Sequence, residues 1–239
     1  MSRKLIVYGG NGFVGSRVVQ RALSANWNVV VARRSGQPVN PKESWVEKVR
    51  WASVDALDRP SVYSLLQEHP DTEAVISTVG LLTMDHKKAI RINGDANVNI
   101  AASVFESKTV RKFVFVSATD IGPAHRVLKG YYQGKRRADR AILETLPDRG
   151  CVLRPAMVYG SRFASGYHIP LGLVGAPMKL VFKPIYSVTG WSLFAPPIEV
   201  EDLAEAAVHA AGHSDVVGIQ GYYDMKNLAG QYRKHDRTQ

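Results

Sequence analysis

A glycine-rich turn near the amino terminus has the composition needed to hold a diphosphate. The turn is Gly9-Gly10-Asn11-Gly12-Phe13-Val14-Gly15, and it follows the apolar run Leu5-Ile6-Val7. Gly12 would let a pyrophosphate approach the backbone, and Gly15 would let a helix pack closely on the preceding strand. Free N–H groups at the start of that helix would face the phosphates. Glycines also occur in plain strand–helix turns, so it is the position between a strand and a helix that predicts a dinucleotide site.

Two arginines follow the second apolar run, where sites that prefer NAD usually carry an acidic residue for the ribose hydroxyls. The sequence there is Arg33-Arg34-Ser35. Paired guanidinium groups suit a 2′-phosphate, although a solvated basic loop would have the same composition. The pair therefore predicts NADP(H) in preference to NAD(H). Asp55, after the third apolar run, is placed either to face an adenine ring or to cap a helix.

Tyr131 and Lys135 form a Tyr-x-x-x-Lys pair whose i, i+4 spacing puts both side chains on one helix face. In a reductase, the lysine ammonium lowers the tyrosine pKa and holds the nicotinamide ribose. The phenol then exchanges the proton that accompanies hydride transfer. Such a pair is common by chance and is usually a surface pairing. Its position after a fifth strand, in a chain that begins with the glycine turn, favours the chemical interpretation.

The elements that must position these groups alternate between strand and helix along the chain. Strands are expected at 4–8, 27–32, 49–54, 74–78, 112–117 and 151–154, and helices at 12–25, after Pro60, and at 87–106, 131–146 and 200–211. This rhythm indicates βαβ units in a doubly wound parallel sheet, with the ligand at the carboxyl ends of the strands. After Pro155 the regularity fades. Residues 160–198 predict a small irregular lobe, and the last ten residues a mobile tail.

Length and composition fit one α/β domain. The 239 residues are 45% hydrophobic and 22% charged, which excludes a disordered chain. The net charge of +10 favours anionic partners, namely nucleotide phosphates, anionic lipids, acidic protein faces or RNA, and it is also typical of mitochondrial matrix proteins. No RNA-binding motif accompanies the basic residues, so nucleic acid is not the expected partner.

The few metal-binding side chains are scattered. A single cysteine, Cys151, excludes a disulfide within the chain and a cysteine-based zinc site, and its apolar setting predicts a buried thiol. His125 and His168 have no second ligand at metal spacing, so no metal site is expected. No apolar run is long enough to span a bilayer. We see no signal peptide, and we expect any targeting sequence to be removed or to lie within the chain.

The order of motifs resembles atypical short-chain dehydrogenase/reductases. The similarity is to the subgroup typified by the Rossmann-fold accessory subunit of mitochondrial respiratory complex I. It is closer still to members related to a yeast ubiquinone-biosynthesis accessory protein and to plant mitochondrial or plastid homologues. The matching stretches cover nearly the whole chain: 4–15, 92–97, 130–136, 153–160 and 196–204. The resemblance implies a single Rossmann-type NAD(P)-binding domain over 1–239, in which 160–198 is a lobe that faces a substrate or partner.

The resemblance also implies roles for individual residues. Tyr131 and Lys135 match the family's acid/base pair, and Asn93 matches a helix asparagine that supports the lysine through water. The family's serine falls at Ser117, or at Ala118 with Thr119 next to it in an ungapped comparison. Arg154 and Pro155 match the strand end beside the nicotinamide. The implied cofactor-binding residues are Gly9, Gly10, Asn11, Gly12, Phe13, Val14, Gly15, Arg33, Arg34, Asp55, Lys135, Arg154 and Pro155.

Two functions follow from the resemblance, and a third remains open. The first is an NADP(H)-binding accessory subunit of a mitochondrial quinone-linked inner-membrane complex, with complex I foremost, at the matrix face or, as the lesser possibility, in a plastid. Its nucleotide would stabilise the fold without turnover. The second is an NADP(H)-dependent reductase or accessory factor in prenylquinone biosynthesis. The third is a redox-sensing interaction module. The lobe at 160–198 would either contact a membrane surface or partner subunit, or cover a pocket.

Overall fold

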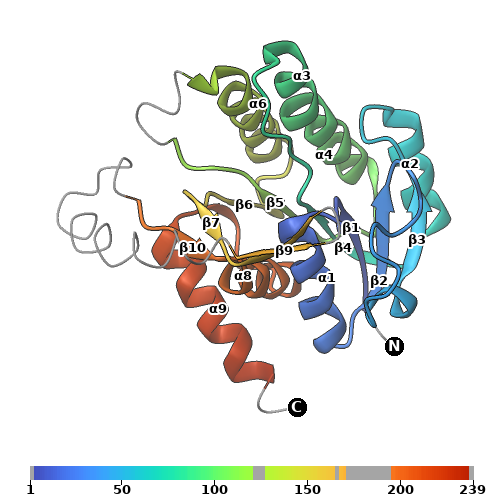
Figure 1. The fold of residues 1–239 in the computed structure, drawn as a ribbon. Helices are drawn as coiled ribbons and strands as arrows, with labels where there is room; N and C mark the ends of the chain where they lie inside the picture. Colours follow the sequence, from blue (N-terminus) through green and yellow to red (C-terminus); the bar gives the residue numbers. More distant parts are fainter. Residues whose placement is uncertain (1–2, 121–126, 165–166, 171–194, 237–239) are drawn as a thin grey trace.

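Seven strands form one sheet in the computed structural model, which describes residues 3–120, 127–164, 167–170 and 195–236 (Figure 1). The strands are β1 Lys4–Tyr8, β2 Asn28–Arg33, β3 Arg50–Ser53, β4 Thr72–Ser77, β5 Lys112–Val116, β6 Gly150–Leu153 and β11 Gly218–Gln220. Their order is β3-β2-β1-β4-β5-β6-β11, and every neighbouring pair is parallel. The order reverses between β1 and β4, which is where ligands bind in open α/β sheets. The predicted doubly wound parallel sheet is confirmed, with β11 as a strand that the sequence did not predict.

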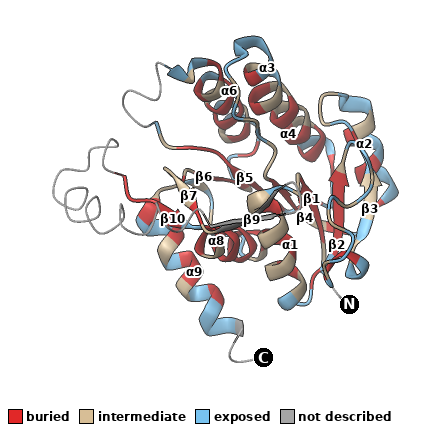
Figure 2. Cartoon of the chain, viewed as in Figure 1, coloured by how far each residue is buried: buried red, intermediate tan, exposed pale blue. Residues whose placement is uncertain are grey.

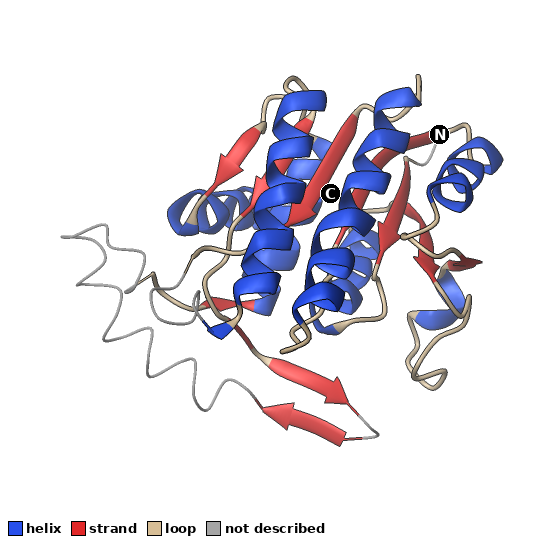
Figure 3. Ribbon diagram, turned by 90° about the horizontal axis from the view of Figure 1, so that it is seen from above, coloured by secondary structure: helices blue, strands red, loops and turns tan. Residues whose placement is uncertain are grey.

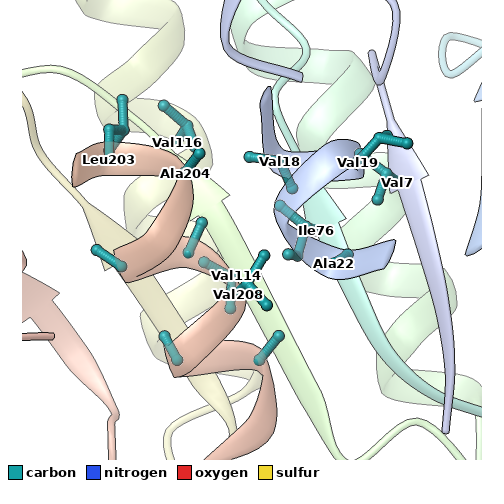
Figure 4. Close-up of a cluster of buried hydrophobic side chains, with 14 of the residues drawn as sticks. Val7, Val18, Val19, Ala22, Ile76, Val114, Val116, Leu203, Ala204 and Val208 are labelled. Carbon is teal, nitrogen blue, oxygen red and sulfur yellow. The ribbon is translucent and has the colours of Figure 1, made fainter. Parts of the chain in front are cut away.

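Helices cover both faces of this sheet, as Figure 2 shows by the buried strands between them. One face packs on α1 Phe13–Ser24, α8 Val200–Gly212 and α9 Tyr222–Asp236. The other packs on α2 Arg59–Glu68, α4 Ala96–Glu106 and α6 Lys129–Thr145. Figure 4 shows part of the first interface, which joins Val18, Val19 and Ala22 of α1, and Leu203, Ala204 and Val208 of α8, to strand residues Val7, Ile76, Val114 and Val116. Two apolar layers thus fix the carboxyl edge of the sheet.

The helix predicted at 87–106 is interrupted. It consists of α3 His86–Ile90, a π-helical turn Arg91–Asp95, and α4. A π-turn adds one residue to the helical repeat and is frequent at functional sites. The additional residue shifts the buried face of the helix, so that both Asn93 and Gly94 point inward.

The carboxyl-terminal part differs from the prediction of a mobile tail. Helix α9 includes residues of the predicted tail as far as Asp236. Its apolar side chains Tyr222, Met225 and Tyr232 are buried against the α1–α8 layer. Asp202 of α8, which is buried, forms ion pairs with Lys226 and Arg233 of α9. The prediction was wrong because the apolar positions of α9 are interleaved with many charged residues.

Short elements surround the region predicted to be a lobe. β7 Val158–Tyr159 pairs with β10 Ile198–Glu199, and β8 Ser161–Ala164 pairs with β9 Tyr167–Pro170 in a hairpin seen apart from the main sheet in Figure 3. A 3-10 turn, Val46–Lys48, follows β2. Residues 171–194 of the predicted lobe lie outside the described residues. Within the described ranges, no helix is long and apolar enough to cross a bilayer.

Candidate functional site

The glycine turn joins β1 to α1 at the point where the strand order reverses. Gly9 has φ of +76°, a left-handed conformation that glycine adopts without strain. The Gly12 N–H donates to the Gly9 carbonyl at 2.9 Å, and the Ser16 N–H donates to the Gly12 carbonyl at 2.9 Å. The chain therefore turns sharply and enters α1 directly after Gly12.

Close packing leaves no space for a side chain at two of these glycines. A Cβ at Gly15 would lie 2.1 Å from the Gly9 carbonyl oxygen and 2.7 Å from Oγ1 of Thr78. A Cβ at Gly9 would lie 2.8 Å from the same hydroxyl oxygen. Thr78 follows β4 and donates from its hydroxyl to the Tyr8 carbonyl at 3.0 Å. Sequence reasoning missed Thr78, although its position at a strand end beside the switch point was a usable signal.

The amino terminus of α1 is open to an anion. No side chain caps it, and its first turn contains no acidic residue. Gly12 is exposed, and a Cβ there would meet only the Gly9 carbonyl oxygen, at 3.3 Å. The first N–H groups of a helix have no partner within the helix and carry the positive end of its dipole. The turn therefore fits a diphosphate, with the N–H groups of the first helical turn as donors.

Arg33 lies beside the turn and is connected to it. Its Nη1 donates to the Gln37 carbonyl and to the side-chain oxygen of Asn11, which also accepts from the Val39 N–H at 2.8 Å. Burial, followed by the charge of Arg34, lowers the pKa of Arg33. Among the described residues, no hydrogen-bond partner occupies its Nε or Nη2, and Arg34 is exposed. The two guanidinium groups thus lie at the end of β2 with donors left over, and their role toward a 2′-phosphate stays a prediction.

Asp55 lies next to this pair but does not cap a helix. The Val54 N–H donates to the Arg33 carbonyl at 2.9 Å, which places the end of β3 beside the end of β2. The exposed Asp55 carboxylate accepts from the Leu57 N–H at 3.0 Å, and the residue that precedes α2 is Asp58. The helix-capping alternative is wrong, and the adenine-facing role of Asp55 stays a prediction.

Lys135 is buried beneath the carboxyl ends of β4 and β5, in the first half of α6. Its Nζ donates to the carbonyls of Val116 at 2.7 Å and Val79 at 3.2 Å. It also lies 4.5 Å from the ring centre of Phe115 and 5.9 Å from that of Tyr131. Burial lowers the pKa of Lys135 to about 7, against the raising effect of Asp139. Burial raises the pKa of Tyr131 to about 12.

Asn93, in the π-turn, lies next to Lys135. Its amide nitrogen donates to the carbonyls of Leu81 at 2.9 Å and Ala89 at 2.8 Å, and its oxygen accepts from the Leu81 N–H at 3.0 Å. A Cβ at Gly80 would lie 3.1 Å from the Asn93 oxygen and 3.2 Å from Lys135 Nζ. The structure therefore brings together two residues that are far apart in sequence, at the bare backbone of Gly80.

The hydroxyls after β5 differ in how they are used. Ser117 is buried, and its Oγ has no hydrogen-bond partner in the described part of the chain. Thr119 instead donates from its hydroxyl to the Arg154 carbonyl at 2.7 Å, and Ala118 has no side-chain donor. Of the three positions considered for the family serine, Ser117 is the one whose hydroxyl remains unused.

The side chain of Arg154 is paired away from the strand end. Its Nη2 lies 2.8 Å from a carboxylate oxygen of Asp139, which also pairs with Arg136. Asp139 is buried, and its other oxygen has no partner among the described residues. Sequence reasoning missed Asp139, although it lies four residues after Lys135 on the same helix. Pro155 is buried at the end of β6, and its carbonyl accepts from the Thr119 N–H at 2.7 Å.

The histidines and the cysteine considered in the sequence differ in how far the structure describes them. His125 lies outside the described residues, and of His168 only the backbone is described. Within the described ranges, no three His, Cys, Asp or Glu side chains are grouped so that they could hold a metal ion. The Cys151 thiol is buried, which raises its pKa to about 12, as expected for an inert side chain.

Known proteins resemble this chain over most of its length. A family model described as NAD(P)H-binding matches residues 9–168. An uncharacterized chloroplastic protein of Arabidopsis thaliana is 36% identical over 241 residues, which span 97% of this chain and 79% of the relative. The mitochondrial protein fmp-52 of Neurospora crassa is 28% identical over 210 residues, or 85% of this chain and 83% of the relative.

Two further similarities cover less of the chain or have a lower sequence identity. MIOREX complex component 2 of Saccharomyces cerevisiae is 35% identical over 86 residues, which span 34% of this chain and 30% of that protein. The solved structure of the Bordetella bronchiseptica enzyme WbmH in complex with NAD+ matches with a TM-score of 0.65 at 16% identity, and covers 93% of this chain and 76% of that one. The structural match shows the shared fold.

Proposed function

The chain belongs to the NAD(P)H-binding family, and from that premise we propose that it binds NADP(H) at the carboxyl edge of its sheet. The observation that carries this proposal is the combination of an uncapped helix with two guanidinium groups beside it. The N–H groups of α1 would hold the diphosphate, and Arg33 with Arg34 would hold the 2′-phosphate by charge-assisted hydrogen bonds. Asp55, which follows Val54 beside the end of β2, would face the adenine.

Calorimetry with NADPH and NADH tests this proposal. The variant Arg33→Ala with Arg34→Ala should bind NADPH about 100-fold more weakly, because two charge-assisted contacts of roughly 1.5 kcal/mol each are lost. Its affinity for NADH should stay the same. Arg50→Ala, which removes an exposed arginine from the edge strand β3, is the matched control. Failure of the unaltered protein to bind either nucleotide would contradict the whole proposal.

The nucleotide is proposed to stabilise an accessory protein in an organelle. Lys135 Nζ already donates to the carbonyls of Val116 and Val79, so less of its hydrogen-bonding capacity is left for a nicotinamide ribose. This supports a nucleotide that is held without turnover and contributes several kcal/mol of stability by mass action.

The relatives support an organellar complex as the place of action. One is chloroplastic, one is mitochondrial, and the yeast relative is a component of the MIOREX complex. We extend this to an accessory subunit at the matrix face of the mitochondrial inner membrane, with respiratory complex I as the first complex to test. The protein should migrate with a membrane complex on native gels of organelle extracts. A protein that remains monomeric in those extracts would contradict this role.

A reductase is the second candidate, and one observation favours it. Lys135 lies beside Asn93 at Gly80 and 5.9 Å from the ring centre of Tyr131, and it donates to the carbonyl of Val116, the residue before Ser117 with its unused hydroxyl. When bound, NADPH would supply the hydride. The chain would supply the phenol of Tyr131 as proton donor, with Lys135 held by two carbonyls to orient the ribose and Asn93 to fix the loop after β4. A prenylated quinone precursor is the proposed substrate.

A further inference from the structure

Three large apolar side chains are exposed at the end of the molecule where α3 and α6 begin. Leu82 is 66% exposed, Met84 is 71% exposed and Val127 is 63% exposed. Leu82 and Met84 belong to the loop that leads from β4 to α3, and Val127 lies two residues before α6. Scattered exposed apolar residues are normal, but exposed apolar residues just before the starts of two helices that pack together indicate a contact surface.

The starts of α3 and α6 are held against each other. A Cβ at Gly130, in the first turn of α6, would lie 2.6 Å from the His86 carbonyl oxygen and 3.0 Å from its Nδ1. The Asp85 carboxylate accepts from the Lys88 N–H at 3.0 Å and so fixes the start of α3. Figure 1 shows α3 and α6 side by side at this end. The apolar side chains therefore project from a fixed backbone.

Exposed cations follow these apolar residues in sequence at the starts of both helices. They are Lys87, Lys88 and Arg91 after the first loop, and Lys129 at the start of α6. Within the described residues, no carboxylate lies within ion-pair distance of any of the four. The one nearby acid on the π-turn, Asp95, is neutralised by Arg137 at 2.7 Å. This end of the molecule thus combines unpaired positive charge with exposed apolar side chains.

We propose that this surface, the α3–α6 end formed by Leu82, Met84, Lys87, Lys88, Arg91, Val127 and Lys129, docks on a bilayer that contains anionic lipids. The apolar side chains enter the interfacial region, and the cations lie among the headgroups. A second copy of the chain would present the same positive charge and be repelled. A protein interface would bury a broad apolar core, whereas here a few exposed apolar side chains lie among exposed cations at the starts of two helices.

Docking in this way orients the candidate site. Tyr131 directly follows Gly130 in the first turn of α6, so the candidate proton donor lies next to the bilayer contact. The glycine turn and Arg33 lie on the other side of the switch point, at β1 and β2. The bilayer contact uses none of the nucleotide-binding residues, so it holds whether or not the nucleotide is NADP(H).

Flotation of the full chain with vesicles tests the proposal. The protein should bind vesicles of phosphatidylcholine with added phosphatidylglycerol, bind phosphatidylcholine alone much more weakly, and dissociate at high salt. Lys87→Gln with Lys88→Gln should weaken binding to anionic vesicles about 30-fold, since each lysine near an anionic surface strengthens binding by roughly 5-fold. Leu82→Ser with Met84→Ser should weaken it about 10-fold.

Matched variants separate docking from total charge, hydrophobicity and folding. Lys108→Gln with Arg111→Gln removes two exposed cations near the opposite edge of the sheet, and Phe105→Ser removes an apolar side chain that is 59% exposed there. Both should bind vesicles like the unaltered protein, and all variants should keep its melting temperature. Arg33→Ala should also keep vesicle binding, which separates this proposal from nucleotide binding. The proposal is overturned if the unaltered protein does not bind anionic vesicles, which is the result expected if the surface binds an acidic protein instead. It is also overturned if the Lys87/Lys88 variant and the Lys108/Arg111 variant lose vesicle binding equally.

Discussion

The glycine turn and the Lys135 region differ in how they are built, although both lie at the carboxyl edge of one sheet. The turn consists of backbone atoms and glycines, and its side facing solvent is open at Gly12. Lys135 is a long charged side chain that the fold has enclosed and paired with two of its own carbonyls. The first region offers unused donors to a ligand, whereas the second has already used most of its hydrogen-bonding capacity.

This difference teaches that nucleotide binding and catalysis are separable in this chain. Donors that need no side chain remain in place as long as β1, β4 and α1 pack. A buried lysine depends on its whole surroundings for its charge, because burial disfavours the cation. Changes at the turn should therefore act through sterics and be large. Changes around Lys135 should act through unpaired polar groups and protonation, and be smaller.

Gly15→Ala should have the largest effect. Its Cβ would lie 2.1 Å from the Gly9 carbonyl oxygen, so α1 must move away from β1. We expect a loss of more than about 4 kcal/mol in the free energy of unfolding, measured in urea, and loss of nucleotide binding. Gly230→Ala in α9 is the control, since nothing lies within 4 Å of its Cβ, and it should stabilise the chain by about 0.5–1 kcal/mol. Equal stability of the two variants would show that the turn is not sterically closed.

Asn93→Leu should have the next largest effect, on the other side of the comparison. The change leaves the Leu81 N–H and the carbonyls of Leu81 and Ala89 without the side-chain partner that they have at the buried π-turn. We expect the free energy of unfolding to fall by about 3 kcal/mol. Gln133→Leu, which changes an exposed amide on α6, should alter it by less than about 0.5 kcal/mol. A small effect at Asn93 would mean that water replaces the amide easily, and the loop after β4 would then not depend on it.

The two regions were also unequally predictable from sequence. The turn was predictable because its signals are local: an apolar strand, glycines at fixed spacing and a helix. The surroundings of Lys135 were not, because its partners are the carbonyls of Val79 and Val116 and the ring of Phe115, which only the parallel pairing of β4 with β5 brings near. The π-turn was not predictable from sequence either, since residues 91–95 have the same kinds of side chains as an ordinary helical turn.

The pH dependence of stability should reveal the buried lysine. The pKa of Lys135 is about 7 in the folded chain and about 10.5 when unfolded, so between these values the unfolded chain binds more protons. Stability should therefore rise with pH, by up to about 1 kcal/mol from pH ~7 to pH ~8. Lys135→Met should remove this rise. Urea unfolding should be kept below pH ~9, where the raised pKa of Cys151 begins to act in the opposite direction. An unchanged slope in the variant would mean that Lys135 stays charged.

Tyr131→Phe should change stability least, because the structure gives the phenol oxygen no described hydrogen-bond partner and the ring contacts with Tyr132 persist. We expect less than about 0.5 kcal/mol, and unchanged NADPH affinity. The variant therefore isolates the proton-transfer role.

If the chain is a reductase, oxidation of NADPH by a prenylated quinone precursor should fall by about 100-fold or more in this variant, and Tyr131→Phe with Lys135→Met should abolish it. If the nucleotide is structural, the unaltered protein should oxidise no NADPH, and Tyr131→Phe should migrate with the same membrane complex. The comparison then holds in its strongest form: the open turn binds the nucleotide, while the enclosed lysine and its tyrosine carry out no proton transfer.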